Sequence, residues 1–168
     1  MLVYHPALDP YHSASRMIKV LQYPVQRALE IERVRIIDFF LVFPAWIKKI
    51  RVPREYAAMK NKVIPDDNPY FYGGRPADVF YQMQPLQMQA ISLLAARDLL
   101  DKAALSKNEW RRGSTSLPKD LLVLARPATD EEKLRLEFLI MTLLKFPLVG
   151  ADGLKHRTGL LEFRYDPT

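Results

Sequence analysis

The segment from Phe39 to Phe43 constrains the fold most, because all of its residues are apolar. Just before it, residues 31–38 combine apolar and charged side chains at helical spacing. A helix over residues 28–43 would therefore have one apolar stripe in its first half and an apolar surface all round in its second half. Such a helix must be buried from several sides or covered by a partner. Pro44 is expected to end it or to begin a short helix over residues 45–50.

The same segment supplies more apolar surface than one small helix usually needs. A monomer rarely exposes a contiguous apolar patch larger than roughly a few hundred Å². The surplus therefore indicates a permanent partner, with a fully internal central helix as the alternative. The candidate partner-binding residues are Phe39, Phe40, Val42, Phe43 and Trp46.

Capping signals and periodicity predict further helices. Asp9 and Pro10 suit the N-cap and first position of a helix. Thr129 and Glu132, three residues apart, form a capping box. The expected helices cover residues 10–22, 54–60, 85–105 and 129–145.

Short strands are expected beside the helices, near residues 2–4, 110–113 and 160–165. The predicted fold class is mainly α with short β hairpins, arranged like a winged helix, with a helical bundle as the alternative. We expect a single compact domain over residues 1–168. The turn-rich stretch 65–76 is the candidate boundary if the chain instead forms two small units.

Several kinds of chemistry lack their usual residues in this sequence. The chain has no cysteine, which excludes disulfides, thiolate nucleophiles and cysteine-ligated metals. The glycines at 73–74 lack the spacing and the lysine of a phosphate-binding loop. His5 and His12 are separated by two prolines and match no zinc motif. We therefore expect no catalytic residues, no cofactor and no metal site.

The sequence also bears on where the protein is located. Its first residues do not combine a basic stretch with a long apolar core, so a signal peptide is not expected. A membrane-spanning helix needs about 20 consecutive apolar residues, and no stretch of that kind occurs. The expected location is the cytoplasm, without membrane association.

A net charge of +6 allows contact with nucleic acid or with an acidic protein surface. Basic residues follow both tryptophans of the chain. A winged helix can place such residues against phosphates. The alternative is that both segments are solvated edges whose tryptophans pack in the core. The candidate nucleic-acid-binding residues are Lys48, Lys49, Arg51, Arg111 and Arg112.

The N-terminal part resembles a known family. Residues 4–12 read Tyr-His-Pro-Ala-Leu-Asp-Pro-Tyr-His, and residues 32–44 read Glu-Arg-Val-Arg-Ile-Ile-Asp-Phe-Phe-Leu-Val-Phe-Pro. These segments resemble the middle component of ABC three-component systems, a group that includes Lamassu-type bacterial defence operons. In that family a His-Pro and Asp-Pro-Tyr-His opening precedes an Asp-Phe-aromatic segment ending in Phe-Pro. The resemblance covers about the first 45 residues, and no family motif is found after Pro44.

The resemblance implies a non-catalytic adaptor subunit in a defence complex against phage or plasmid DNA. Such a subunit links an SMC-like ABC ATPase, which binds the ATP, to an effector that is often a nuclease. DNA would be reached through the complex. Two alternatives remain: a stand-alone winged-helix DNA-binding regulator, and an enzyme whose site is formed by His5, Asp9 and His12.

Overall fold

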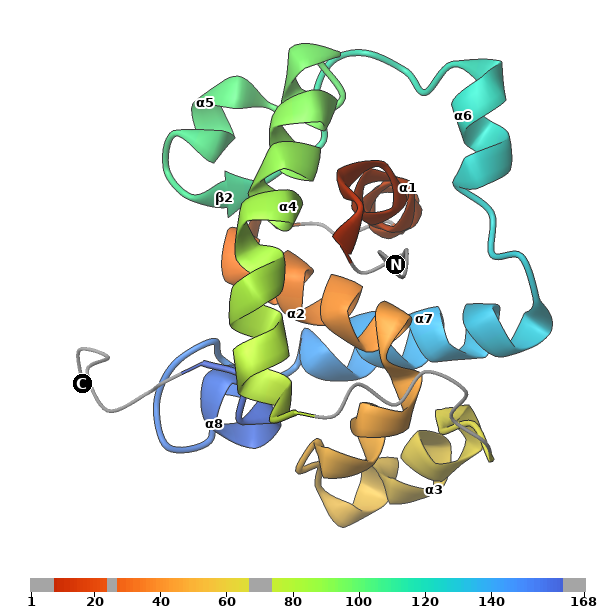
Figure 1. Cartoon of the computed structure of the whole chain (residues 1–168), viewed down its shortest axis with the longest axis vertical. Coiled ribbons are helices and arrows are strands. Elements are labelled where there is room, and N and C mark those ends of the chain that lie inside the picture. The colour runs from red at the N-terminus through yellow and green to blue at the C-terminus, as the bar shows by residue number, and fades with distance from the viewer. Residues whose placement is uncertain (1–7, 24–26, 67–73, 162–168) are drawn as a thin grey trace, which may run out of the picture.

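The computed structural model describes residues 8–23, 27–66 and 74–161 (Figure 1). Helices dominate these segments, and the only described strands form one short antiparallel pair. The prediction of a mainly helical fold with short strands is therefore confirmed. In chain order the elements are α1 (Pro10–Leu21), β1 (Leu29–Glu30), α2 (Ile31–Val42), the 3-10 helix η2 (Pro44–Lys49), α3 (Arg54–Val63), α4 (Pro76–Ala96), α5 (Lys102–Leu105), β2 (Glu109–Trp110), α6 (Lys119–Leu124), α7 (Asp130–Leu143) and α8 (Leu154–Thr158).

Helix α2 lies at the centre of the fold. It contacts α1, α4, α7, η2 and both strands, and α4 crosses it in Figure 1. Its first turns share one apolar cluster with α1 and the C-terminal part of α4. Its last turns share a second cluster with η2, α7 and the N-terminal part of α4. One helix therefore belongs to both halves of the core.

The structure corrects the prediction that the aromatic segment binds a partner. Phe39, Phe40, Phe43 and Trp46 are all at most 5% exposed, and only Val42 is half-buried. The ring of Phe39 stacks on Trp46 with centroids 5.4 Å apart and meets Phe80 edge-on. Because α4, α7 and η2 cover this segment, its apolar surplus is used inside the chain. The four aromatic side chains are therefore not available to a partner in this structure.

The two strands come from distant parts of the chain. Leu29 pairs with Trp110, and Glu30 pairs with Glu109. The pair therefore joins remote segments, whereas the wing of a winged helix is a hairpin of consecutive strands. Two of the expected strands cannot be compared in full: the one at 2–4 and residues 162–165 of the one at 160–165 lie outside the described residues. Positions 67–73 of the candidate boundary also lie outside them. The division into domains stays a prediction.

Helix α4 begins earlier than its expected start at Pro85. It starts at Pro76 and continues through Pro85, which lies on the exposed side of the helix. The carbonyl that loses its helical donor there belongs to Tyr81, also on the exposed side, so water can satisfy it. The helix ends at Ala96, before Asp98 takes a left-handed conformation (φ 54°). The predicted end at residue 105 is wrong for this reason.

The capping box before α7 is present. Thr129 Oγ1 accepts a hydrogen bond from the Glu132 amide at 3.1 Å. The Glu132 carboxylate accepts one from the amide of Ala128, one residue before the N-cap, at 2.6 Å. It also forms an ion pair with Lys19 of α1. The start of α7 is thus tied both to its own first turn and to α1.

Replacing Thr129 with alanine is expected to lower the free energy of unfolding by about 1 kcal/mol, because one amide of the first turn loses its acceptor. Urea denaturation followed by circular dichroism measures this change. The matched control is Thr115→Ala, at an exposed loop threonine, where a change within about 0.5 kcal/mol is expected. Equal losses at the two positions would contradict a capping role.

Candidate functional site

A buried polar cluster connects three helices near the middle of the molecule. Asp38 of α2 is fully buried and accepts three hydrogen bonds. The donors are Ser13 Oγ at 3.0 Å, Arg16 Nε at 2.6 Å and Gln87 Nε2 at 2.9 Å. Since Ser13 and Arg16 belong to α1 and Gln87 to α4, the carboxylate fixes the relative positions of α1, α2 and α4.

Arg35 lies at the edge of this cluster and is only 5% exposed. Its Nε donates to Gln87 Oε1 at 2.9 Å, and its guanidinium lies 4.7 Å from the ring centroid of Phe80. Among the described residues, its Nη2 has no hydrogen-bond partner. Burial lowers the pKa of Arg35, against the opposing effect of the negative charges of Glu32 and Asp38. Arg35 is thus a poorly solvated cation whose position is fixed by Gln87 and Phe80.

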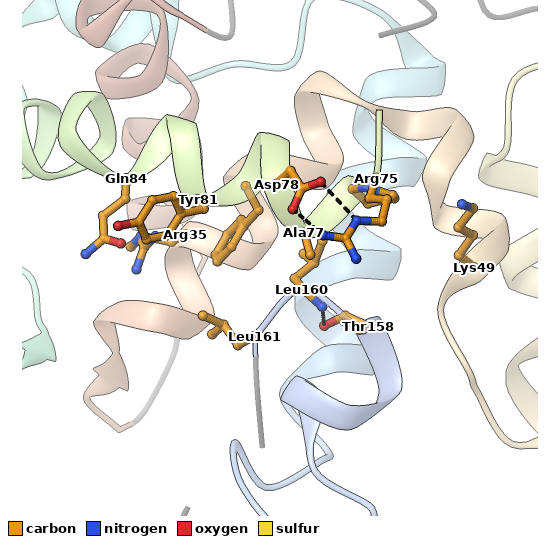
Figure 2. Close-up of a pocket in the computed structure, with 13 residues that line it drawn as sticks. Arg35, Lys49, Arg75, Ala77, Asp78, Tyr81, Gln84, Thr158, Leu160 and Leu161 are labelled. Carbon is orange, nitrogen blue, oxygen red and sulfur yellow. Dashed lines mark hydrogen bonds and ion pairs between the residues drawn. The ribbon is translucent and has the colours of Figure 1, made fainter. Parts of the chain in front are cut away.

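Arg35 borders a cavity of about 910 Å³, here called the α4 groove. The groove runs along the N-terminal half of α4, between that helix and the segment after α8 (Figure 2). It is lined by three cationic side chains, those of Arg35, Lys49 and Arg75. In Figure 2, Arg35 lies towards one end and Lys49 towards the other. Between them Arg75 donates to the carboxylate of Asp78 at 3.0 Å.

A second exposed feature is apolar. No residue of α6 is buried, and Leu122, Val123 and Leu124 are 39%, 72% and 47% exposed. In Figure 1 this helix lies at the side of the molecule, beyond α1, which it contacts. A small cavity of about 160 Å³ lies between α6, α1 and α4, and its lining includes Tyr11 and Leu93. The exposed side of α6, together with this cavity, is called the α6 apolar surface.

The predicted nucleic-acid-binding residues are all exposed but do not form one surface. Lys48, Lys49 and Arg51 lie on or just after η2, near α3 and α8. Arg111 and Arg112 follow β2, which Figure 1 shows beside α5 at another part of the molecule. Arg111 also approaches the carboxylates of Asp101 and Glu109.

Both tryptophans beside these basic residues are buried, in agreement with a structural role for the rings. Trp46 and Trp110 are 5% and 4% exposed. Stacking on nucleic-acid bases requires an accessible ring face. Direct contact between this chain and DNA stays a prediction that rests on the exposed cations alone.

The residues considered for catalysis are only partly described. The Asp9 carboxylate accepts hydrogen bonds from the amides of Tyr11 and His12 and so caps α1, while His5 lies outside the described residues. Within residues 8–23, 27–66 and 74–161, no group of three or more histidine, aspartate or glutamate side chains could hold a metal ion. No helix in those segments is long and apolar enough to cross a membrane.

The sequence offered only weak signals for the two surfaces. The run Leu121–Leu124 is apolar and follows a proline, but it resembles any short core segment. Arg35 and Arg75 stand among other charged residues, and their approach to Lys49 depends on tertiary structure. Of the three groove cations, sequence reasoning therefore identified only Lys49.

Comparison with known proteins gives one family. The family model described as "ABC-three component (ABC-3C) system Middle Component 5" matches residues 2–166. The match extends far beyond the N-terminal segment that carried the resemblance in the sequence. No curated protein and no solved structure matches the chain.

Proposed function

Since the chain belongs to the Middle Component 5 family of ABC-three component systems, we propose that it is a non-catalytic adaptor that holds an effector subunit to an ABC ATPase. The family match over residues 2–166 carries this proposal. In the proposed complex, an SMC-like ATPase binds and hydrolyses ATP. The effector, for example a nuclease, acts on the target, and this chain joins the two subunits. The complex would act in the cytoplasm against phage or plasmid DNA, as Lamassu-type systems do.

The α6 apolar surface supports an adaptor role. Three consecutive large apolar side chains are exposed on a helix with no buried residue. Exposed apolar side chains gathered on one short helix are typical of protein interfaces. We propose that it contacts one of the two partner subunits.

The adaptor proposal is tested by co-expression of this chain with the ABC ATPase and the effector encoded beside it. A ternary complex that remains intact during size-exclusion chromatography is expected. The ATPase purified without this chain should still hydrolyse ATP. Failure of this chain to co-purify with either product would overturn the proposal. ATP hydrolysis or nuclease activity by the isolated chain would contradict its non-catalytic part.

Changing Val123 to Asp is expected to weaken binding of one partner at least tenfold, because a carboxylate would have to be desolvated in an apolar contact. The thermal midpoint of the isolated chain should stay almost unchanged, since Val123 is 72% exposed. Biolayer interferometry with the purified partners measures the affinity.

The control for this variant is Met59→Asp, an exposed apolar position on α3 (49% exposed), which should leave both affinities unchanged. Figure 1 places α3 at the opposite end of the molecule from α6. Unaltered binding of both partners by the Val123 variant would show that the α6 apolar surface is not the interface.

A further inference from the structure

The geometry of the α4 groove points to a specific occupant: we propose that it receives an extended acidic segment of a partner subunit, with one carboxylate of that segment bound by Arg35. The inference rests on the adaptor function proposed above and adds to it a site and a ligand chemistry. It concerns a surface different from the α6 apolar surface. The groove, the buried Arg35 and the exposed Lys49 are the observations that carry it.

Comparison of the two buried arginines of α2, Arg33 and Arg35, shows that Nη2 of Arg35 lacks a hydrogen-bond acceptor among the described residues. Arg33 is fully buried and its donors are used: it binds the Glu30 carboxylate and the carbonyls of Leu143 and Phe146. Arg35 is almost as buried, but the described residues accept a hydrogen bond only from its Nε. A buried cation with an unused donor is costly unless an acceptor arrives. An anion entering the groove would supply both the acceptor and the opposite charge.

The surroundings hold Arg35 ready for such an anion. Gln87 fixes its Nε, the Phe80 ring lies against the guanidinium, and the main-chain carbonyl of Arg35 accepts from Gln87 Nε2 at 3.1 Å. Because the side chain is already ordered, little conformational entropy would be lost on binding. A guanidinium edge suits the two oxygens of a carboxylate, which it can bind through two parallel hydrogen bonds.

The rest of the groove fits an extended peptide better than a single small anion. Its cations are spread along its length, from Arg35 to Lys49 (Figure 2). Apolar groups also line the groove, including Leu161 and the ring of Tyr81, which is 75% exposed. A peptide that alternates acidic and apolar side chains would place carboxylates on the cations and apolar groups on the apolar lining.

Nucleic acid is a poorer fit to the same features. Single strands bind along continuous rows of exposed cations with accessible aromatic faces. Here the Asp78 carboxylate already occupies Arg75, so the cations of the groove do not form a continuous row that is open to a phosphate chain. Arg35 is also recessed, so a side-chain carboxylate would reach it more easily than a bulky backbone phosphate.

The test measures peptide binding by the full chain. The probe is a fluorescein-labelled peptide that alternates glutamate and leucine, and the reference peptide carries glutamine in place of each glutamate. Fluorescence anisotropy should show binding of the acidic peptide alone. Arg35→Met and Lys49→Glu should each weaken it at least tenfold. Lys107→Glu, the same charge change at an exposed lysine that does not line the groove, should leave it unchanged.

The possible outcomes separate this inference from the adaptor function. If Arg35→Met fails to fold, Lys49→Glu still tests the groove, because Lys49 is exposed and its replacement should not disturb folding. Equal affinity for the acidic and glutamine peptides, or tighter binding of a single-stranded DNA competitor at the groove, would overturn the inference. If Lys49→Glu assembles the ternary complex with unchanged affinity for both partners, the groove is not a partner site although the adaptor function stands. Acidic-peptide binding without any ternary complex in the wild type would overturn the adaptor function instead.

Discussion

Replacing Phe39 with alanine is expected to lower the free energy of unfolding by about 3–5 kcal/mol. Phe39 is fully buried and lies at the centre of an aromatic group. Its ring lies within 5.6 Å, between centroids, of the rings of Phe40, Phe43, Trp46 and Phe80. Truncation removes the apolar contacts of the ring and leaves a cavity that α2, η2 and α4 cannot easily close.

Chemical denaturation of the purified variant measures this loss. Since domains of this size are commonly stable by only about 5–15 kcal/mol, the variant should unfold at a much lower urea concentration than the wild type. The matched control is Tyr81→Ala, an aromatic residue that is 75% exposed, where a change of less than about 1 kcal/mol is expected. Similar losses in the two variants would contradict the central position of Phe39.

The behaviour of this segment shows what the sequence could and could not predict. An apolar surface on all sides of a helix required burial from several directions, and α2 is buried in this way. The sequence left open whether the cover came from the same chain or from a partner. Only the tertiary packing of α4, η2 and α7 decides this, because those elements are far from α2 in sequence or separated from it by a proline.

Local signals were reliable where a hydrogen bond within one turn determines the structure. Asp9 and Thr129 cap their helices as their residue types predict. Pro85 was misleading because its effect on a helix depends on which side it faces. Strand β1 was hidden because its partner, β2, lies in the other half of the sequence.

The candidate sites depend almost entirely on tertiary structure. Arg35 becomes a site because its neighbours satisfy Nε and leave Nη2 without an acceptor among the described residues. The α6 apolar surface exists because no other described element covers Val123. Neither condition can be read from spacing, since both concern what packs beside a residue.

Asp38→Ala is the second variant with a large expected effect, also about 3–5 kcal/mol of unfolding free energy. The carboxylate is fully buried and accepts from Ser13, Arg16 and Gln87. Its removal takes away the ion pair of the Arg16 guanidinium, whose side chain is 11% exposed. The contacts of α1 and α4 with α2 should weaken together, because the same two oxygens hold both helices.

Double-mutant analysis distinguishes this role from a simple loss of packing. If Asp38 acts by balancing Arg16, then adding Arg16→Met to Asp38→Ala should recover a measurable part of the lost stability, since the arginine that lost its carboxylate is removed as well. The control is Asp152→Ala, which removes an 87% exposed carboxylate paired with Arg157 and should cost less than about 1 kcal/mol. Strictly additive losses for Asp38 and Arg16 would mean that the two charges act independently. In that case the hydrogen bonds from Ser13 and Gln87, and not the ion pair with Arg16, would account for the contribution of Asp38 to the position of α2, from which Arg35 reaches the groove.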